Sequence, residues 1–526
     1  MDVDAVATIS WIVAFVLTTV VVTGLVGRIG WSAPVALVIV GGAVSFVPAV
    51  PQIQVEPDLI LYGILPPLLF AAAIRTSLVD IRARRDSILL LSVGLVAFTV
   101  VTVGFATLLL VPAVTVAAAF AFAAVIAPTD AIAVTAIAGR LKLPRRVVTI
   151  LEGESLLNDA TALVALNAAI AAIISVVEPT EVALDFVLAV VVGMAVGLAV
   201  GWLVSLVRSR LHSAVLDTSL TLVTPFAAFL IGQFLHGSGV LAVVIAGLYL
   251  GFRAPWVASA EARVAERLNW RTIQFLLENA VFLFIGLNLR GILAGAMTTG
   301  PGLWQTVLIC AGILLALVAS RFAWVMGTTL LYRKGPARLR ERGWAWGNGV
   351  AVASAGVRGV VTLAAVFLLP PETPSRSYLQ FLAFVVVVAS LVGGLALPWI
   401  IRRLKLPAPS FTQELTERRL LMVEARQAGI DRLDEEEVTP DEQHVADLLR
   451  GDAGFLGETL DEYGPDASIP QLEAKLRLRS AMLEAERAAV LRARIEGRFQ
   501  EPAIVAALQA IDAEETALRA QFPRPD

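Results

Sequence analysis

The chain has 526 residues, of which 57% are hydrophobic and only 16% are charged, and its mean hydropathy is +0.79. This composition excludes an ordinary soluble globular protein and indicates a polytopic membrane protein. The formal net charge of −3 hides an asymmetry, because residues 404–526 hold 25 acids and 15 bases while the remainder holds 19 acids and 26 bases. The single cysteine, Cys310, excludes an intrachain disulfide, and three scattered histidines argue against a histidine metal site.

Apolar segments long enough to cross a bilayer recur through the first four fifths of the chain. They lie near 9–27, 32–49, 58–74, 87–111, 113–138, 146–174, 183–207, 217–236, 239–252, 272–289, 304–331, 345–369 and 379–401. The first segment lacks the basic start of a signal peptide, so we expect it to be retained as a span. The sequence therefore predicts an all-α membrane protein with about 13 transmembrane helices.

The loops between these spans alternate in charge. Arginine and lysine gather after spans 1, 3, 5, 7, 9, 11 and 13, whereas the other loops hold few bases, with Arg290 and Arg376 as exceptions. By the positive-inside rule we expect the N-terminus outside and the C-terminal tail in the cytoplasm.

The tail, residues 404–526, differs in composition from the spans. Its segments near 411–428, 471–498 and 502–520 have helical spacing with interleaved Glu and Arg. It contains no nucleotide-binding, metal-binding or hydrolase motif. We expect a solvated helical appendage, with regulation or protein contact as the alternative.

Two spans are interrupted. Pro128 breaks span 5, and the sequence Ala-Ser-Ala-Gly-Val-Arg-Gly at 353–359 interrupts span 12. Interrupted spans in corresponding positions indicate a transporter with inverted repeats and a binding site near the middle of the membrane. We expect the two broken helices to cross there, so that their dipole ends balance each other and a bound ion.

Four acids lie close together around the first break, namely Asp130, Glu152, Glu154 and Asp159. An acid inside the membrane is costly and marks a candidate functional site. Asp130 follows the break beside Thr129, while Ser155 and Asp159 are four residues apart and share one helix face. We expect Asp159 and Asp130 to bind an ion, with Ser155 and Thr129 as further oxygen donors.

Glu154 and Asn158 lie on the neighbouring face of the same helix, which indicates a structural role. A buried charge needs a partner, and both Arg321 and Arg358 lie in the middle of spans, so we expect one of them to neutralise Glu154. Glu152, nearer the cytoplasmic end, either faces the entrance or has another role. Glycines spaced by four, namely Gly193, Gly197 and Gly201, predict close helix packing.

The chemistry of these side chains favours a monovalent cation. Carboxylates, hydroxyls and freed carbonyls are hard oxygen ligands, and a desolvated carboxylate also takes up a proton readily. A site that holds either a cation or a proton is the core of an antiporter. A cation channel, a proton-coupled uptake carrier and a membrane sensor acting through the tail remain alternatives. An intramembrane enzyme would need a nucleophile–base pair or a metal constellation, and the sequence shows neither.

Several motifs together resemble the Na+/H+ exchanger (NhaP-type) family of cation:proton antiporters, over roughly residues 1–403. They are Leu-Pro-Pro-Leu-Leu-Phe at 65–70, Pro-Thr-Asp at 128–130, Glu-Gly-Glu-Ser-Leu-Leu-Asn-Asp at 152–159, His-Gly-Ser-Gly-Val-Leu-Ala at 236–242 and Gly-Val-Arg-Gly at 356–359. The motif at 152–159 is the most specific of these.

The resemblance implies a homodimer in a bacterial plasma membrane, with a core domain of spans 4–6 and 11–13 and a dimerisation domain of mainly spans 1–3 and 7–10. It implies that Na+ binds to Asp159, Asp130, Ser155 and the Thr129 carbonyl. It also implies that Glu154 pairs with Arg321 alongside Asn158, and that Asn at 158 before Asp159 is typical of electroneutral exchange.

The implied function is exchange of Na+ or Li+ for H+ in pH and sodium homeostasis, with K+ as the alternative cation. No cofactor is expected besides the transported ions, and neither is a nucleic-acid partner. Two positions depart from the family pattern. Ala71 and Ala72 stand where many relatives have an acid, and Gln233 stands at a second such position.

Overall fold

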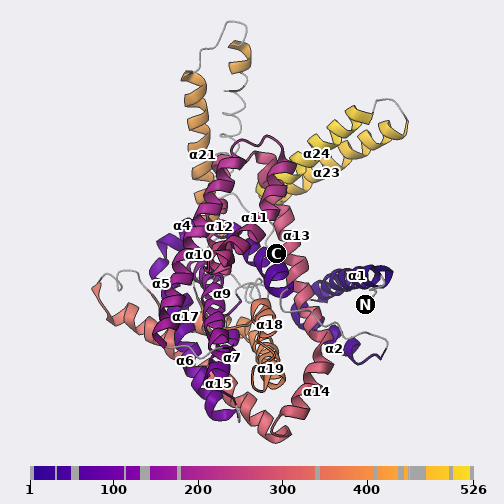
Figure 1. Cartoon of the computed structure of the whole chain (residues 1–526). Helices are drawn as coiled ribbons and strands as arrows, with labels where there is room; N and C mark the ends of the chain where they lie inside the picture. Colours follow the sequence, from indigo (N-terminus) through magenta and orange to yellow (C-terminus); the bar gives the residue numbers. More distant parts are fainter. Residues whose placement is uncertain are drawn as a thin grey trace. The chain divides into compact units, whose positions relative to one another are not determined.

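The computed structural model consists of two compact units, Met1–Pro407 and Ala408–Asp526 (Figure 1). The structure describes residues 5–29, 32–48, 59–111, 114–130, 143–174, 179–337, 344–406, 411–435, 443–447, 449, 469–496 and 501–521. Within these residues the regular structure is helical throughout.

The first unit consists of a long series of helices. In chain order these are α1 (Ala5–Ile29), α2 (Ala33–Ser45), η1 (Leu59–Ile64), α3 (Leu65–Arg75), α4 (Leu78–Ala83), α5 (Arg85–Leu89), η2 (Leu90–Leu95), α6 (Val96–Leu110), α7 (Val116–Ile126), α9 (Arg145–Ile174), α10 (Pro179–Arg208), α11 (Ala214–Phe234), α12 (Gly239–Val257), α13 (Ala260–Leu287), α14 (Leu289–Thr299), α15 (Leu303–Lys334), α17 (Trp346–Ser354), α18 (Val360–Val366), α19 (Arg376–Gly394) and α20 (Leu397–Leu404).

Nine helices among the described residues are long and apolar enough to cross a membrane, and three more are apolar but shorter. The shorter ones include α7 of the broken span 5, and span 12 is divided between α17 and α18. The all-α membrane fold is confirmed, whereas the count of 13 spans stays a prediction.

Span 10 begins earlier than its composition suggests. The predicted segment was 272–289, but α13 starts at Ala260, where the Ser259 hydroxyl accepts a hydrogen bond from the Ala262 N–H. Residues 260–271 are rich in Glu, Arg and Ala, which favour a helix while lowering its hydropathy. The predicted loop is therefore the polar start of the helix, and the predicted loop after span 10 contains α14.

Extensive packing occurs within two sets of helices. In one set α12 packs on α3, α10 and α11, and α13 packs on α2 and α3. In the other, α6 packs on α7 and α15, and α9 packs on α7 and η2. A Cβ on Gly193 or Gly197 would collide with the carbonyl of Ser238 or Ala242, and one on Gly201 would press on Tyr249. The prediction that these glycines allow close helix packing is confirmed.

The two interruptions meet inside this unit. Helix α7 ends at Ile126, and α17 and α18 are separated by residues 355–359. The Asp130 N–H donates a hydrogen bond to the Val357 carbonyl at 2.8 Å, so the two unwound segments lie side by side. The part of span 5 after Asp130 lies outside the described residues. The predicted meeting of two broken helices is confirmed on the side that the structure describes.

A buried ion triad joins α10, α11 and α13. The Arg208 guanidinium, fully buried, donates to both oxygens of Asp217 at 2.8 and 2.9 Å and also to Glu266. The guanidinium pairs with both carboxylates, so each of these buried charges has a partner of opposite sign. The triad therefore stabilises the first set of helices at one end.

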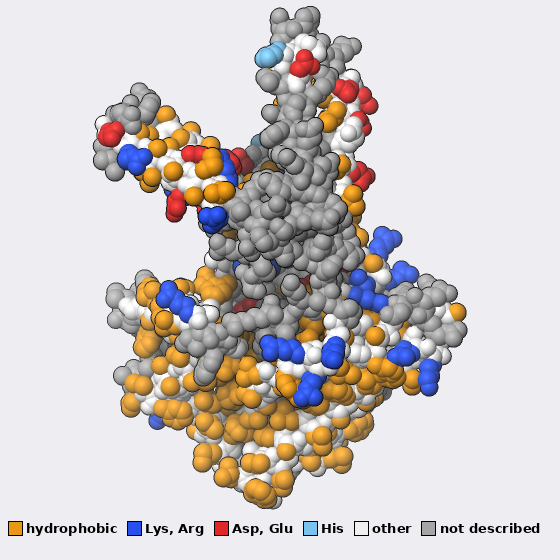
Figure 2. Space-filling model, turned by 180° about the vertical axis from the view of Figure 1, so that it is seen from behind, with side chains coloured by type: hydrophobic (Ala, Val, Ile, Leu, Met, Phe, Trp, Pro, Cys, Tyr) orange, Lys and Arg blue, Asp and Glu red, His pale blue; other side chains and the backbone are white. Residues whose placement is uncertain are grey.

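The surface of the first unit shows how it meets its surroundings. Large apolar side chains such as Leu109 and Leu303 are 85% and 86% exposed, as suits contact with lipid. Figure 2 shows a broad hydrophobic surface with Lys and Arg side chains gathered along one of its edges. This pattern is typical of a polytopic membrane protein.

The second unit contains α21 (Phe411–Glu435), α23 (Ile469–Ile495) and α24 (Glu501–Gln521). Helices α23 and α24 pack together through Leu483, Ile511 and Leu518. Arg479 bridges to Glu486 and Glu514, and Arg487 bridges to Asp512 and Glu515. The described residues of the tail thus form helices, as its helical spacing and charge pattern predict.

Candidate ion-binding site

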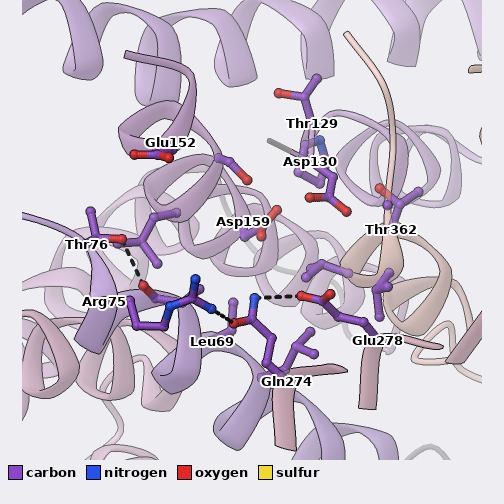
Figure 3. Close-up of a pocket in the computed structure, with 18 of the residues that line it drawn as sticks. Leu69, Arg75, Thr76, Thr129, Asp130, Glu152, Asp159, Gln274, Glu278 and Thr362 are labelled. Atoms are coloured by element: carbon purple, nitrogen blue, oxygen red, sulfur yellow. Dashed lines mark hydrogen bonds between the residues drawn. The ribbon is translucent and has the colours of Figure 1, made fainter. Parts of the chain in front are cut away.

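A cavity of about 350 Å³ lies where the first interruption faces α9, α3, α13 and α18. Its polar lining comes from all five segments: Arg75, Thr76, Thr129, Asp130, Glu152, Ser155, Asp159, Arg271, Gln274, Glu278 and Thr362. Figure 3 shows Asp130, Asp159 and Glu278 around the same space. The cavity therefore brings together residues from positions 68 to 362 of the chain.

The four residues predicted to hold the ion all line this cavity. Asp159 and Ser155 come from one face of α9, because residues four apart lie one above the other on a helix. Asp130 and Thr129 come from the unwound segment after α7. Two carboxylates, a hydroxyl and a backbone carbonyl form a donor set of oxygen alone, which suits a hard cation.

The adjoining face of α9 carries a buried hydrogen-bond network. Glu154, only 1% exposed, receives Arg321 Nη1 at 2.6 Å and Nη2 at 3.2 Å. The Thr129 hydroxyl donates to Glu154 at 3.0 Å, and the Asn158 amide donates to the Thr129 hydroxyl and carbonyl at 3.0 and 3.2 Å. Of the two arginines considered from the sequence, Arg321 is therefore the partner of Glu154.

Arg358 has a different role. Its Nε donates to the Ile126 carbonyl at 3.2 Å, and its Nη1 donates to the Gly356 carbonyl. Ile126 is the last residue of α7, where the helix dipole places partial negative charge. A buried guanidinium at this end therefore balances the dipole of the broken helix.

Arg321 does the same for the other broken helix. Besides Glu154 it donates to the carbonyls of Val352 and Ala353, at 2.9 and 3.2 Å, near the end of α17. Each interrupted span thus has an arginine at the C-terminal end of its first half. The sequence showed both arginines, but backbone carbonyls leave no mark in a sequence, so these partners were not predicted.

The backbone of the second interruption lies directly against the Asp130 side chain. A Cβ added to Gly359 would overlap the Asp130 carboxylate. Glycine at this position lets Asp130 lie directly against the chain between α17 and α18.

Several residues of the cavity were not predicted from the sequence. Arg75 Nη1 donates to Gln274 Oε1 at 2.8 Å, and Gln274 Nε2 donates to Glu278 Oε1 at 2.7 Å. Glu278 could have been found, because it is an acid in the apolar run of span 10 and meets the criterion that singled out Asp130. Glu152, left undecided, is exposed at the mouth of the cavity, as are Arg75 and Arg271.

Comparison with known proteins shows the same family along the spans. Residues 13–403 match the family described as "Sodium/hydrogen exchanger, transmembrane". An uncharacterized Na(+)/H(+) exchanger, Rv2287, of Mycobacterium tuberculosis is 31% identical and covers 96% of this chain and 95% of its own. The sodium, potassium, lithium and rubidium/H(+) antiporter of Bacillus subtilis is 27% identical over 90% of this chain and 73% of its own.

The fold has a solved counterpart. The structure of the sodium proton antiporter MjNhaP1 from Methanocaldococcus jannaschii at pH 8 matches with a TM-score of 0.62 at 17% identity, over 76% of this chain and 99% of that one. With the family match along most of the chain, the cavity lined by paired acids belongs to a transporter. The chain is a member of the sodium/hydrogen exchanger family of cation/proton antiporters, and not an enzyme.

Proposed function

We propose that this protein exchanges Na+ or Li+ for H+ across a bacterial plasma membrane, one cation for one proton, and so serves pH and sodium homeostasis. The observation that carries the proposal is the shared cavity of Asp130, Asp159, Ser155 and Thr129. Na+ and H+ are substrates here, and the mechanism requires no cofactor and no nucleic-acid partner.

Asp159 is the residue at which cation and proton compete. No lysine or arginine among the described residues forms an ion pair with it, and Asp130 is the other carboxylate predicted to bind the ion in the same cavity. In this mechanism an arriving Na+ displaces the proton of Asp159, with Asp130, Ser155 and the Thr129 carbonyl as further ligands. The Thr129 carbonyl accepts from Asn158, but a carbonyl oxygen has a second lone pair for the cation.

The charges around the site support electroneutral exchange. Glu154 and Arg321 neutralise each other, and Asn158 adds no charge beside Asp159. In this mechanism one Na+ replaces one proton at Asp159, with no second titrating acid directly beside it on α9.

Alternating access explains how the ion crosses. We propose a core domain of spans 4–6 and 11–13 that moves against a dimerisation domain of mainly spans 1–3 and 7–10, in a homodimer. The two sets of packed helices support this division, since α9 and α13 lie in different sets. Only a loaded or protonated site should cross, because a bare carboxylate is too costly in an apolar barrier.

The cavity opens toward the cytoplasm in this proposal. Its mouth lies at the end of α3 that leads into the arginine-rich segment 82–85, and Arg75, Glu152 and Arg271 are exposed there. Bases favour the cytoplasmic side, which also places the N-terminus outside and the tail inside.

Potassium is the second candidate cation. The Bacillus subtilis relative carries sodium, potassium, lithium and rubidium in its name, so one related protein is associated with several monovalent ions. The same oxygen ligands would serve K+ if the cavity widened.

Exchange in proteoliposomes tests the proposal. A pH gradient is imposed, Na+, Li+ or K+ is added in turn, and lumenal pH is followed with a dye. We expect Na+ to collapse the gradient in wild type and about a hundredfold less rapidly, or not at all, in Asp159→Asn. Collapse of the gradient by K+ alone would identify K+, and not Na+, as the exchanged cation. No collapse by any ion, from folded protein, would reject the antiporter.

A further inference from the structure

Glu278 is an acid of the cavity that the mechanism above does not use. It lies in the middle of α13, within the apolar sequence Phe-Leu-Leu-Glu-Asn-Ala-Val-Phe-Leu-Phe at 275–284. Placing a carboxylate at such a position costs free energy, and a purely structural acid normally has a basic partner. Glu278 instead lines the space that holds Asp130 and Asp159.

A polar chain holds Glu278 in place. Gln274, one turn earlier on α13 and 5% exposed, donates to the Glu278 carboxylate and accepts from Arg75 on α3. Figure 3 shows these three side chains in a row along the wall facing Asp159. The row starts at Arg75, exposed at the mouth, and ends at Glu278 inside the cavity.

The contacts of Glu278 differ from those of Glu154. Glu154 has an arginine at salt-bridge distance, whereas no lysine or arginine of the described residues lies within that distance of Glu278. Its direct partner is a neutral amide, which holds the carboxylate without cancelling its charge. The carboxylate therefore retains its capacity to attract a cation or to bind a proton.

Glu278 lies on a different wall of the cavity from Asp130 and Asp159. Asp130 and Asp159 belong to the unwound segment after α7 and to α9, while α13 packs on α2 and α3. Asp130 and Glu278 face the same cavity from these two walls. Like charges facing one cavity are stabilised by a cation between them.

We propose that Glu278 is an entry carboxylate of the exchange path, which attracts the incoming cation at this open face and passes it to Asp159 without being a ligand of the loaded site. The inference rests on the proposed exchange and on movement between the two helix sets. Because α13 and α9 lie in different sets, Glu278 faces Asp159 when the cavity opens to this side and not when the site opens to the other. Replacing Glu278 should therefore change the apparent KM for the cation at only one face of the membrane.

Membrane vesicles of both orientations test this asymmetry. Everted vesicles expose the cytoplasmic face, and right-side-out vesicles expose the other face. For Glu278→Gln we expect the apparent KM for Na+ to rise about tenfold at the cytoplasmic face and to stay unchanged at the other. The maximal rate should remain within about twofold of wild type, because the ligands of the loaded state are untouched.

Matched variants separate charge from structure. Glu261→Gln removes the same charge from an exposed position of α13 and should leave both KM values unchanged. Glu278→Asp keeps the carboxylate and should restore most of the affinity. If Glu278→Gln yields no folded protein, Gln274→Leu removes the group that positions the carboxylate and should raise the cytoplasmic KM alone.

Three results would overturn the inference. They are a wild-type KM for Glu278→Gln at both faces, an equal rise at both faces, and a Glu278→Asp variant as impaired as Glu278→Gln. Wild-type vesicles measured in parallel distinguish these failures from failure of the proposed function. If wild type exchanges Na+ for H+ and Glu278→Gln behaves identically, only the role of Glu278 is rejected.

Discussion

Two faces of α9 carry acids in opposite surroundings. Glu154 is 1% exposed and bound by Arg321 and Thr129, so its charge is neutralised inside the protein. Asp159, little more than one turn further along, faces the cavity with Ser155 and has no ion pair with a lysine or arginine in the described part of the chain. The residue types are nearly the same, and the helix face decides what each can do.

In the proposed mechanism Glu154 has a structural role, whereas Asp159 exchanges the ions. A neutralised buried pair does not compete for the transported ion, and it joins α9 to α15 and to the end of α17. In the proposed mechanism Asp159 takes either Na+ or H+, because no lysine or arginine of the described residues forms an ion pair with it. The variants below test this division of roles.

Removing Arg321 should have the largest effect on stability. Arg321→Ala leaves Glu154 charged and buried and two carbonyls at the end of α17 without a donor. We expect a loss of about 3–5 kcal/mol, seen as a lower unfolding temperature and less folded protein in detergent. Adding Glu154→Gln should restore part of the loss by removing the stranded charge. A wild-type unfolding temperature for Arg321→Ala would contradict the structural role of this face.

Gly359→Ala should impair exchange more than stability. The added Cβ would overlap the Asp130 carboxylate and displace it from the cavity. Since misplacing a reacting group by about 1 Å can cost about a hundredfold, we expect the exchange rate to fall tenfold or more. Gly393→Ala is the matched control, because a Cβ there has open space around it. Equal rates for the two variants would show that Asp130 need not lie where the structure places it.

Ser155→Ala should give the smallest effect. It removes one oxygen from the cavity face and leaves both carboxylates. The expected loss of about 1 kcal/mol corresponds to an apparent KM for Na+ about fivefold higher, with the maximal rate retained. Ser219→Ala, an exposed hydroxyl that bonds its own helix, provides the comparison. A Ser155→Ala variant with the wild-type KM would remove this hydroxyl from the ligand set.

Local patterns predicted much of the site. The spacing of Ser155 and Asp159 placed them on one face, and Pro128 marked the first interruption, because helix periodicity and proline geometry act within a few residues. The assignment of Glu154 to a separate face also follows from spacing alone. These features need only the local chain, so a single sequence reveals them.

Contacts between distant parts of the chain were harder to predict from the sequence. The row of Arg75, Gln274 and Glu278 joins α3 to α13 across about 200 positions, and no local pattern connects them. Arg358 donates to backbone carbonyls, which every residue has, so the sequence could not identify its partners. The early start of α13 was missed because its first turns are charged, which resembles a loop when judged by hydropathy alone.

Proton release on cation binding directly reports whether Na+ and H+ compete at Asp159. Purified protein in detergent and weak buffer is titrated with Na+, and the protons released are measured with a pH dye. We expect release of about one proton per bound Na+ from wild type, and none from folded Asp159→Asn. Release from Asp159→Asn equal to that of wild type would show that another group exchanges the proton, and would contradict the role of the open face of α9.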